Sequence, residues 1–137
     1  MYLRELWLSK TKLKKAIQKV EDYLDDLGIQ VCYSDEVSDS FCDLYWYEIH
    51  IPESETEESI LFSLLHEGGH FLVEAHDLFD SDVEDDIDII INEVLAWEAG
   101  LDIAESCELD IEMKSYYNTA KESLEKYIKA YRKKNPW

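Results

Sequence analysis

The spacing of apolar residues predicts one helix and two strands in the first part of the chain. Over residues 9–28, apolar side chains recur every three or four positions, as they do along the buried stripe of a helix, and Gly28 supplies the stop. Residues 29–34 and 43–52 are rich in aromatic and β-branched residues, and the second segment ends at Pro52. We therefore expect two short strands that form a small two-stranded β element.

The second half of the chain predicts three helices. An acidic turn at residues 56–58 favours the N-terminus of a helix that continues through a group of histidines. A polar loop over residues 77–86 leads to a strongly apolar helix at 87–106, and a long amphipathic helix follows at 111–134. This order of elements indicates a mainly helical α+β fold. No linker divides residues 1–137, which we expect to form one domain.

The charge of the chain is strongly negative and unevenly distributed. Its 32 acidic residues outnumber its 13 basic ones, for a formal net charge of −19, and no Lys or Arg occurs from Val20 to Met113. Proteins that bind nucleic acid through phosphates need clustered cations, so the sequence argues against direct nucleic-acid binding. The negative field instead favours a basic protein or peptide as the partner.

Composition also bears on the compartment. Hydrophobic residues make up 46% of the chain, which is enough for a folded core. No segment approaches the roughly 18 to 20 consecutive apolar residues of a membrane span, so we expect no membrane association. Cys32, Cys42 and Cys107 are odd in number and form no CxxC pair. We therefore expect reduced thiols in a cytoplasm.

One short segment combines ionisable groups with apolar surroundings. His66, Glu67 and His70 spell HExxH inside the apolar run SLLHEGGHFL. Residues four apart lie on the same face of a helix, about 6 Å from each other, so both imidazoles can reach one metal ion. Glu67 lies roughly 100° further round the helix, close enough to take a proton from zinc-activated water. The motif predicts a zinc site with Glu67 as the catalytic general base.

A zinc site needs a third protein ligand, and His76 is one candidate. With His76 the motif reads HExxHxxxxxH, which resembles the three-histidine spacing of the metzincins. In that family a glycine three residues after the second histidine breaks the helix. Here that position holds Val73, a β-branched residue poorly suited to a positive φ. If the helix continues, His76 points roughly 120° away from His70, so His76 is the alternative ligand.

The apolar helix at 87–106 supplies the preferred third ligand, Glu93. On a helical wheel Asn92 belongs to the solvated side, whereas Glu93 falls on the face that we expect to meet the core. A carboxylate on that face needs a cation, because burying an isolated charge is prohibitive. Glu98 lies nearer the polar edge and is a weaker candidate.

With His66, Glu67, His70 and Glu93 in these positions, the chain resembles small zinc metallopeptidases of the gluzincin type, in which a downstream helix supplies a glutamate. It looks particularly like the compact HExxH proteins of phages and mobile elements, including the ImmA/IrrE group. The resemblance implies a minimal zincin-like domain with Zn²⁺ as its cofactor. It also implies hydrolysis of a peptide bond in a protein substrate, in the host cytoplasm if the chain is of phage origin.

A peptidase also needs a group that stabilises the oxyanion of the tetrahedral intermediate. Tyr116 and Tyr117 stand early in the last predicted helix, and a helix packed over the zinc site would bring them close. His76 and Lys114 are the alternatives for this role. These side chains are the candidates to lie at the metal, and the alternative is that both tyrosines are core residues of an amphipathic helix.

Two further features of the sequence indicate close packing. Gly68 and Gly69 each cost roughly 1 kcal/mol relative to alanine inside a helix, which close approach by a strand or by a crossing helix would offset. Tyr45, Tyr47 and Ile49 alternate along the second predicted strand. They are candidates to line a substrate groove or to pack in the core.

Three functions compete on the sequence alone. The first is a zinc metallopeptidase in which zinc-activated water attacks the scissile carbonyl and Glu67 moves the proton to the leaving amine. The second is a highly acidic binding or inhibitor protein, similar to nucleic-acid mimics, that occupies a basic surface. The third is a zincin-like domain that binds zinc and is catalytically inactive. The HExxH motif favours the first.

Overall fold

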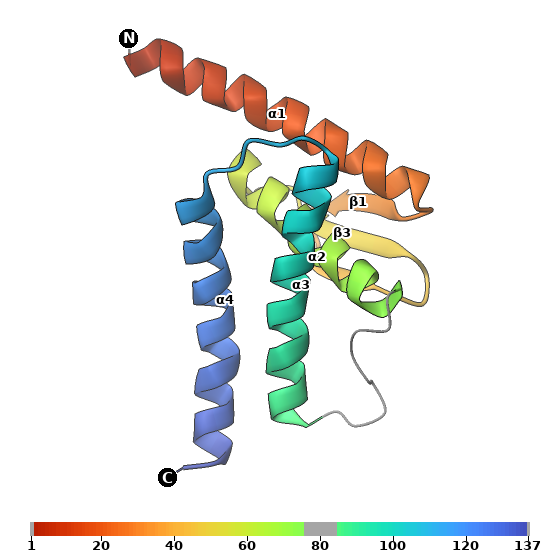
Figure 1. The fold of residues 1–137 in the computed structure, drawn as a ribbon, viewed down its shortest axis with the longest axis vertical. Helices are drawn as coiled ribbons and strands as arrows, with labels where there is room; N and C mark the ends of the chain where they lie inside the picture. The colour runs from red at the N-terminus through yellow and green to blue at the C-terminus, as the bar shows by residue number, and fades with distance from the viewer. Residues whose placement is uncertain (1, 76–84, 137) are drawn as a thin grey trace.

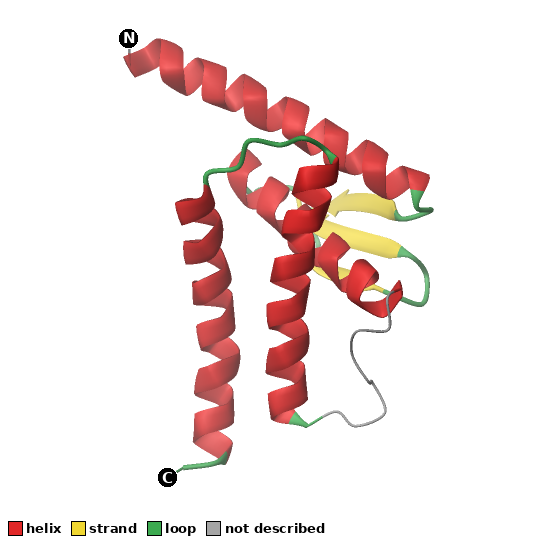
Figure 2. Ribbon diagram, viewed as in Figure 1, coloured by secondary structure: helices red, strands yellow, loops and turns green. Residues whose placement is uncertain are grey.

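Four helices and one small sheet make up the described part of the chain (Figure 1; Figure 2). The structure is a computed structural model that describes residues 2–75 and 85–136, with side chains from residue 11 onward. The elements are α1 Tyr2–Asp26, β1 Gln30–Ser34, β2 Phe41–Asp43, β3 Glu48–Pro52, α2 Glu57–Ala75, α3 Asp86–Ser106 and α4 Met113–Lys134. The mainly helical α+β fold expected from the sequence is confirmed.

The sheet has three strands, whereas the sequence predicted two. Its order is β1-β3-β2, with β3 in the centre, parallel to β1 and antiparallel to β2. The single strand predicted over residues 43–52 is wrong, because the chain reverses after Asp43. The side chain of Asp43 accepts hydrogen bonds from the backbone N–H groups of Tyr45 and Trp46, and Tyr47 has a φ of 56°. An aspartate that bonds the backbone ahead of it in this way forms a turn.

The turn between β2 and β3 separates the aromatic residues predicted to alternate along one strand. Tyr45 and Tyr47 are 81% and 54% exposed, whereas Ile49 is fully buried in β3. The ring of Tyr47 contacts that of Phe71 in α2, with the ring centroids 5.7 Å apart. Tyr45, Tyr47 and Ile49 therefore do not form one stripe.

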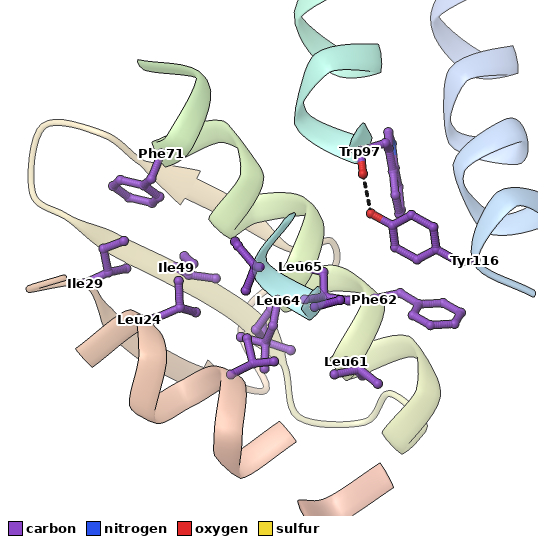
Figure 3. Close-up of a cluster of buried hydrophobic side chains, with 14 of the residues drawn as sticks. Leu24, Ile29, Ile49, Leu61, Phe62, Leu64, Leu65, Phe71, Trp97 and Tyr116 are labelled. Atoms are coloured by element: carbon purple, nitrogen blue, oxygen red, sulfur yellow. Dashed lines mark hydrogen bonds between the residues drawn. The ribbon is translucent and has the colours of Figure 1, made fainter. Parts of the chain in front are cut away.

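Helices α1 and α2 pack on one face of the sheet, and the main core lies between these helices and the sheet (Figure 1; Figure 3). Ile49 and Ile51 of β3 are fully buried on this inner face. Ile49 belongs to the same apolar cluster as Leu24 of α1 and Leu64 of α2. Since side chains alternate along a strand, Glu48 and His50 of β3 point to the opposite, outer face.

Helices α2 and α3 cross at unusually short range, and glycines permit the crossing. A Cβ atom built on Gly69 would stand 2.0 Å from the carbonyl oxygen of Ala96, and one on Gly100 would stand 2.8 Å from that of Leu65. Gly68 faces the ends of side chains from α1 and α3 instead. Of the two neighbours considered from the sequence, the crossing helix is therefore the one that approaches the paired glycines.

Side-chain caps explain where α2 and α3 begin. The hydroxyl of Thr56 accepts a hydrogen bond from the backbone of Ser59 at 3.2 Å, and Asp85 forms a capping box with Asp88 at the start of α3. Each cap satisfies a backbone N–H group that the helix itself leaves without a partner. Within the described ranges, no helix has both the length and the apolar character required to cross a bilayer.

Helix α4 lies beside α3 and is anchored through Tyr116 (Figure 1; Figure 3). This tyrosine is 1% exposed, and its hydroxyl donates a hydrogen bond to the carbonyl oxygen of Trp97 in α3. Its ring also meets that of Phe62 in α2 edge-on, with the centroids 5.2 Å apart. The contact fixes α4 against α3 near the site described next.

Candidate metal centre

The crossing of α2 and α3 brings the three predicted zinc ligands together. His66 Nε2 lies 2.9 Å from Glu93 Oε2, and His70 Nε2 lies 3.3 Å from the same oxygen. His66 and Glu93 are 8% and 9% exposed, so both are buried. We call His66, Glu67, His70 and Glu93 the inner cluster.

The geometry of the inner cluster fits a metal ion better than a set of hydrogen bonds. Glu93 Oε2 is buried and accepts no well-directed hydrogen bond from the described residues, although both ring nitrogens are close. Leaving such an oxygen without a partner costs roughly 1–3 kcal/mol or more. Ligands bound tetrahedrally at 2.0–2.1 Å stand about 3.3 Å apart, which is close to the separations found here. The donor set of two imidazoles and one carboxylate suits zinc.

The electrostatics of the cluster keep Glu93 ionised. Burial by itself would raise the pKa of Glu93, but the contacts with His66 and His70 hold it well below its usual range. For His70 the effects have the opposite sign. Burial by itself would lower the pKa of His70, but the neighbouring carboxylate of Glu93 raises it overall. A charged carboxylate is the form that a metal ligand requires.

Two side chains outside the motif orient the ligands. Asn92 Oδ1 lies 3.0 Å from Nδ1 of His70, so this nitrogen donates the hydrogen bond and Nε2 is left to face Glu93. The hydroxyl of Tyr127 in α4 donates to Oε1 of Glu93 at 2.9 Å. Partners of this kind fix the tautomer and the direction of metal ligands.

Sequence reasoning missed both of these orienting residues. The helical wheel placed Asn92 on the solvated side of its helix, but it is half-buried, because α2 crosses α3 at this point. Its position directly before Glu93 is the one signal that could have identified it. Tyr127 gave no signal, since only the packing of α4 on α3 brings it to the site.

The ring of His66 is held by stacking. It lies nearly parallel to the ring of Trp97, with the centroids 4.2 Å apart and an interplanar angle of 19°. His66 Nδ1 has no hydrogen-bond partner among the described residues. Contact with the indole therefore takes over the orienting role that Asn92 has for His70.

Glu67 lies beside the ligands with its carboxylate directed at the same space. It is 6% exposed, and its carboxylate lies within 4.8 Å of ring nitrogens of both His66 and His70. Burial raises the pKa of Glu67, and the two histidines lower it by less. The hydroxyl of Ser40 lies 3.5 Å from Oε2, and the thiol of Cys42 donates a further hydrogen bond. A raised pKa brings a carboxylate nearer the range where it can both accept and release a proton.

A cavity of about 510 Å³ opens onto the inner cluster. Ser40 and Cys42 line it on the side of β2, and Thr119, Lys126 and Tyr127 line it from α4. Its volume lies within the range of about 300–1,000 Å³ typical of ligand sites. Lys126 is the cation of this lining, in a chain without Lys or Arg from Val20 to Met113.

The tyrosines predicted to stabilise an oxyanion lie elsewhere. Tyr116 and Tyr117 line a separate groove between α3 and α4, and neither lines the cavity of the inner cluster. Tyr116 points into an aromatic group, with Trp97 5.3 Å from its ring, so its hydroxyl is not available to the site. Lys114 is exposed and does not line the cavity either. The tyrosine that does line it is Tyr127.

The alternatives for the third ligand have different outcomes. His76 lies outside the described residues. Glu98 is exposed and lines the groove between α3 and α4, away from the histidines. Of the two glutamates considered from the sequence, the structure brings Glu93 to His66 and His70.

Comparisons with known proteins give no family assignment. No protein-family model matches the chain, and neither a curated protein nor a solved structure matches it. The likeness to gluzincins therefore remains a resemblance carried by His66, Glu67, His70 and Glu93. A function has to follow from the geometry of these residues.

Proposed function

We propose that this protein is a zinc-dependent metallopeptidase, with His66, His70 and Glu93 as the zinc ligands and Glu67 as the general base. One observation carries the proposal. Two imidazole nitrogens converge on a buried carboxylate oxygen that accepts no well-directed hydrogen bond from the described residues, and a second buried carboxylate stands beside them. A cation at this point would relieve the cost of burying these groups.

Zinc, Glu67 and Tyr127 would have distinct roles at the inner cluster. A zinc ion, when bound, would polarise the substrate carbonyl and lower the pKa of a coordinated water to about 7. Glu67 would accept a proton in the cavity and release it to the leaving amine, for which its raised pKa is suitable. Burial also raises the pKa of Tyr127, so its hydroxyl stays protonated and keeps donating its hydrogen bond to Glu93.

The surroundings of the cavity favour a peptide with basic residues. Asp39 and Glu55 line the cavity together with the inner cluster, and the net charge of the chain is −19. Strand β2 is an edge strand of the sheet and contributes Cys42 to the cavity wall. An extended peptide can add to such an edge through backbone hydrogen bonds. The cysteines are free, which supports a reducing compartment such as the cytoplasm.

The test compares Glu67→Gln with Glu74→Gln. Both changes remove one negative charge from α2, but Glu74 is exposed and lies near the end of the helix. With zinc present and a mixture of quenched fluorescent peptides containing Lys or Arg as the substrate, Glu67→Gln should lower the rate by about 10²–10⁴. Glu74→Gln should leave the rate unchanged, and both variants should hold as much zinc as the parent protein.

The competing functions give different results in the same experiment. An acidic binding protein would respond equally to the two variants, because each changes the net charge of −19 by one unit. An inactive zinc-binding domain would hold zinc but hydrolyse no peptide even with Glu67 intact. Either result would refute the peptidase proposal.

A further inference from the structure

A second group of metal-ligating side chains lies on the outer face of the sheet. Glu48 and His50 alternate along β3 with the buried residues Ile49 and Ile51, so they point away from the core. Their side chains are 32% and 24% exposed. In the adjacent strand β1, Cys32 is directly opposite His50 in the register of the parallel pair.

These three residues present their ligating atoms to a common point. The Cys32 thiol, a carboxylate oxygen of Glu48 and a ring nitrogen of His50 lie within 4.8 Å of one another. His50 Nε2 is 3.3 Å from Glu48 Oε1, a separation close to that between two ligands of one tetrahedral ion. The thiol of Cys32 is free and only partly buried. We call Cys32, Glu48 and His50 the outer cluster.

The imidazole of the outer cluster has a fixed orientation. Phe41 is paired with His50 across β2 and β3, and the two rings are stacked, with centroids 4.6 Å apart and an interplanar angle of 12°. A stacked ring loses less freedom when it binds an ion than one that rotates in solvent. Phe41 therefore serves the outer cluster as Trp97 serves His66.

We propose that the outer cluster is a second metal site, which takes zinc or another divalent ion of similar softness through thiolate, imidazole and carboxylate. A thiolate with an imidazole suits zinc and does not suit Mg²⁺ or Ca²⁺, which prefer oxygen ligands. Three protein ligands leave the fourth tetrahedral position to water on the solvent side. The ion would connect β1 to β3 on the face opposite the core and stabilise their parallel pairing.

The outer cluster is separate from the inner one because of strand alternation. On β2, Cys42 is opposite Ile49 and points inward, where its thiol contacts Glu67, whereas Phe41 is opposite His50 on the outer face. The inner cluster offers nitrogen and oxygen ligands, and the outer one adds sulfur. A spectroscopic probe that responds to sulfur alone can therefore tell them apart.

The test uses Co²⁺ in the intact chain. Cobalt bound by a thiolate shows a charge-transfer absorption in the near ultraviolet, whereas cobalt bound by His66, His70 and Glu93 does not. We expect this absorption in the parent protein, its loss in Cys32→Ser and its retention in Cys107→Ser, the matched control. Failure of the peptidase proposal would leave these results unchanged, because none of them depends on hydrolysis.

A second measurement on the parent chain covers the case in which Cys32→Ser folds poorly. Alkylation of each cysteine is followed by peptide mass mapping with and without Zn²⁺, and zinc should slow the reaction of Cys32 but not that of Cys107. Absence of the absorption, its persistence in Cys32→Ser, or its loss only in Cys42→Ser would overturn the proposal. Equal alkylation of Cys32 with and without zinc would also overturn it.

Discussion

The inner and outer clusters present similar donors in different surroundings. In the inner cluster, His66 and Glu93 are 8% and 9% exposed, and the ligands are held by residues from α3 and α4. In the outer cluster, the side chains of His50 and Glu48 are 24% and 32% exposed, and His50 Nε2 lies 3.3 Å from Glu48 Oε1. Each cluster joins two neighbouring elements of the fold.

The difference lies in what happens when no ion is bound. The partly exposed side chains of the outer cluster can form hydrogen bonds with water when no ion is bound, so the absence of the ion costs them little free energy. The buried ligand atoms of the inner cluster cannot reach water. An oxygen such as Oε2 of Glu93 then stays without a well-directed hydrogen bond. We therefore expect the inner site to bind its ion more tightly and to couple it to folding, whereas the outer site adds a smaller, exchangeable contribution.

The largest expected effect is the loss of zinc in Glu93→Ala. Removing this ligand should weaken zinc binding by more than about 100-fold, beyond the range for residues that only orient ligands. Glu98→Ala, an exposed control in the same helix, should leave the affinity unchanged. Zinc competition with a chromophoric chelator measures both, and zinc should raise the melting temperature of Glu93→Ala much less than that of the parent protein. A larger loss in His76→Ala would instead favour the three-histidine arrangement.

The next effect concerns the crossing that forms the inner cluster. Gly69→Ala should lower the free energy of unfolding by about 3 kcal/mol, because its Cβ would stand 2.0 Å from the backbone oxygen of Ala96. Gly68→Ala meets the end of Ile103 at 2.9 Å, a side chain that can move. Its better helix propensity, about 1 kcal/mol, should offset most of the strain. Urea denaturation compares the two, and equal losses would contradict the close helix crossing.

Residues that orient the inner ligands should have intermediate effects. Asn92→Ala should weaken zinc binding by about 10–100-fold, since His70 loses the acceptor of its Nδ1–H group. Asn92→Asp should retain the affinity, because a carboxylate accepts the same hydrogen bond. Tyr127→Phe removes only the hydrogen bond to Glu93, so we expect a loss near the lower end of that range. Isothermal titration with zinc measures all three, and full affinity in Asn92→Ala would show that His70 needs no orienting partner.

The smallest effect is expected at the outer cluster in the absence of metal. Glu48→Gln should change the free energy of unfolding by less than about 1 kcal/mol, because a partly exposed contact such as that between His50 and Glu48 contributes little. In Glu93→Ala, zinc bound at the outer cluster should still raise the melting temperature. Glu48→Gln should lose part of this contribution from the outer cluster. Thermal unfolding of both variants with and without zinc measures this difference. If Glu48→Gln lowered the free energy of unfolding by several kcal/mol without metal, the contacts of the outer cluster would stabilise the fold even without an ion, contrary to this expectation.

The sequence by itself determined those features that depend on neighbours along the chain. The HExxH spacing fixes His66, Glu67 and His70 on one helix, because helix geometry alone relates positions one and four residues apart. Amphipathic periodicity assigned Glu93 to the buried face of α3, and the same reasoning predicted a mainly helical α+β fold. Each of these inferences needs only local backbone geometry.

Strand propensity gave a wrong prediction at the turn between β2 and β3, where hydrogen bonds to the side chain of Asp43 reverse the chain. The aromatic residues after Asp43 have high strand propensity, yet two backbone N–H groups bond its side chain and reverse the chain. The resulting third strand positions Cys42 beside Glu67 and Phe41 over His50. Strand propensity is a weak guide where such a turn competes with it.

Tertiary structure alone decided which distant residues complete each cluster. Asn92 reaches His70 because glycines let α2 and α3 cross closely, and Tyr127 reaches Glu93 because α4 packs beside α3. Cys32 meets His50 through the register of a parallel strand pair whose members are joined by way of β2. Crossing distances and strand register arise from packing between elements far apart in the sequence, and no local periodicity encodes them.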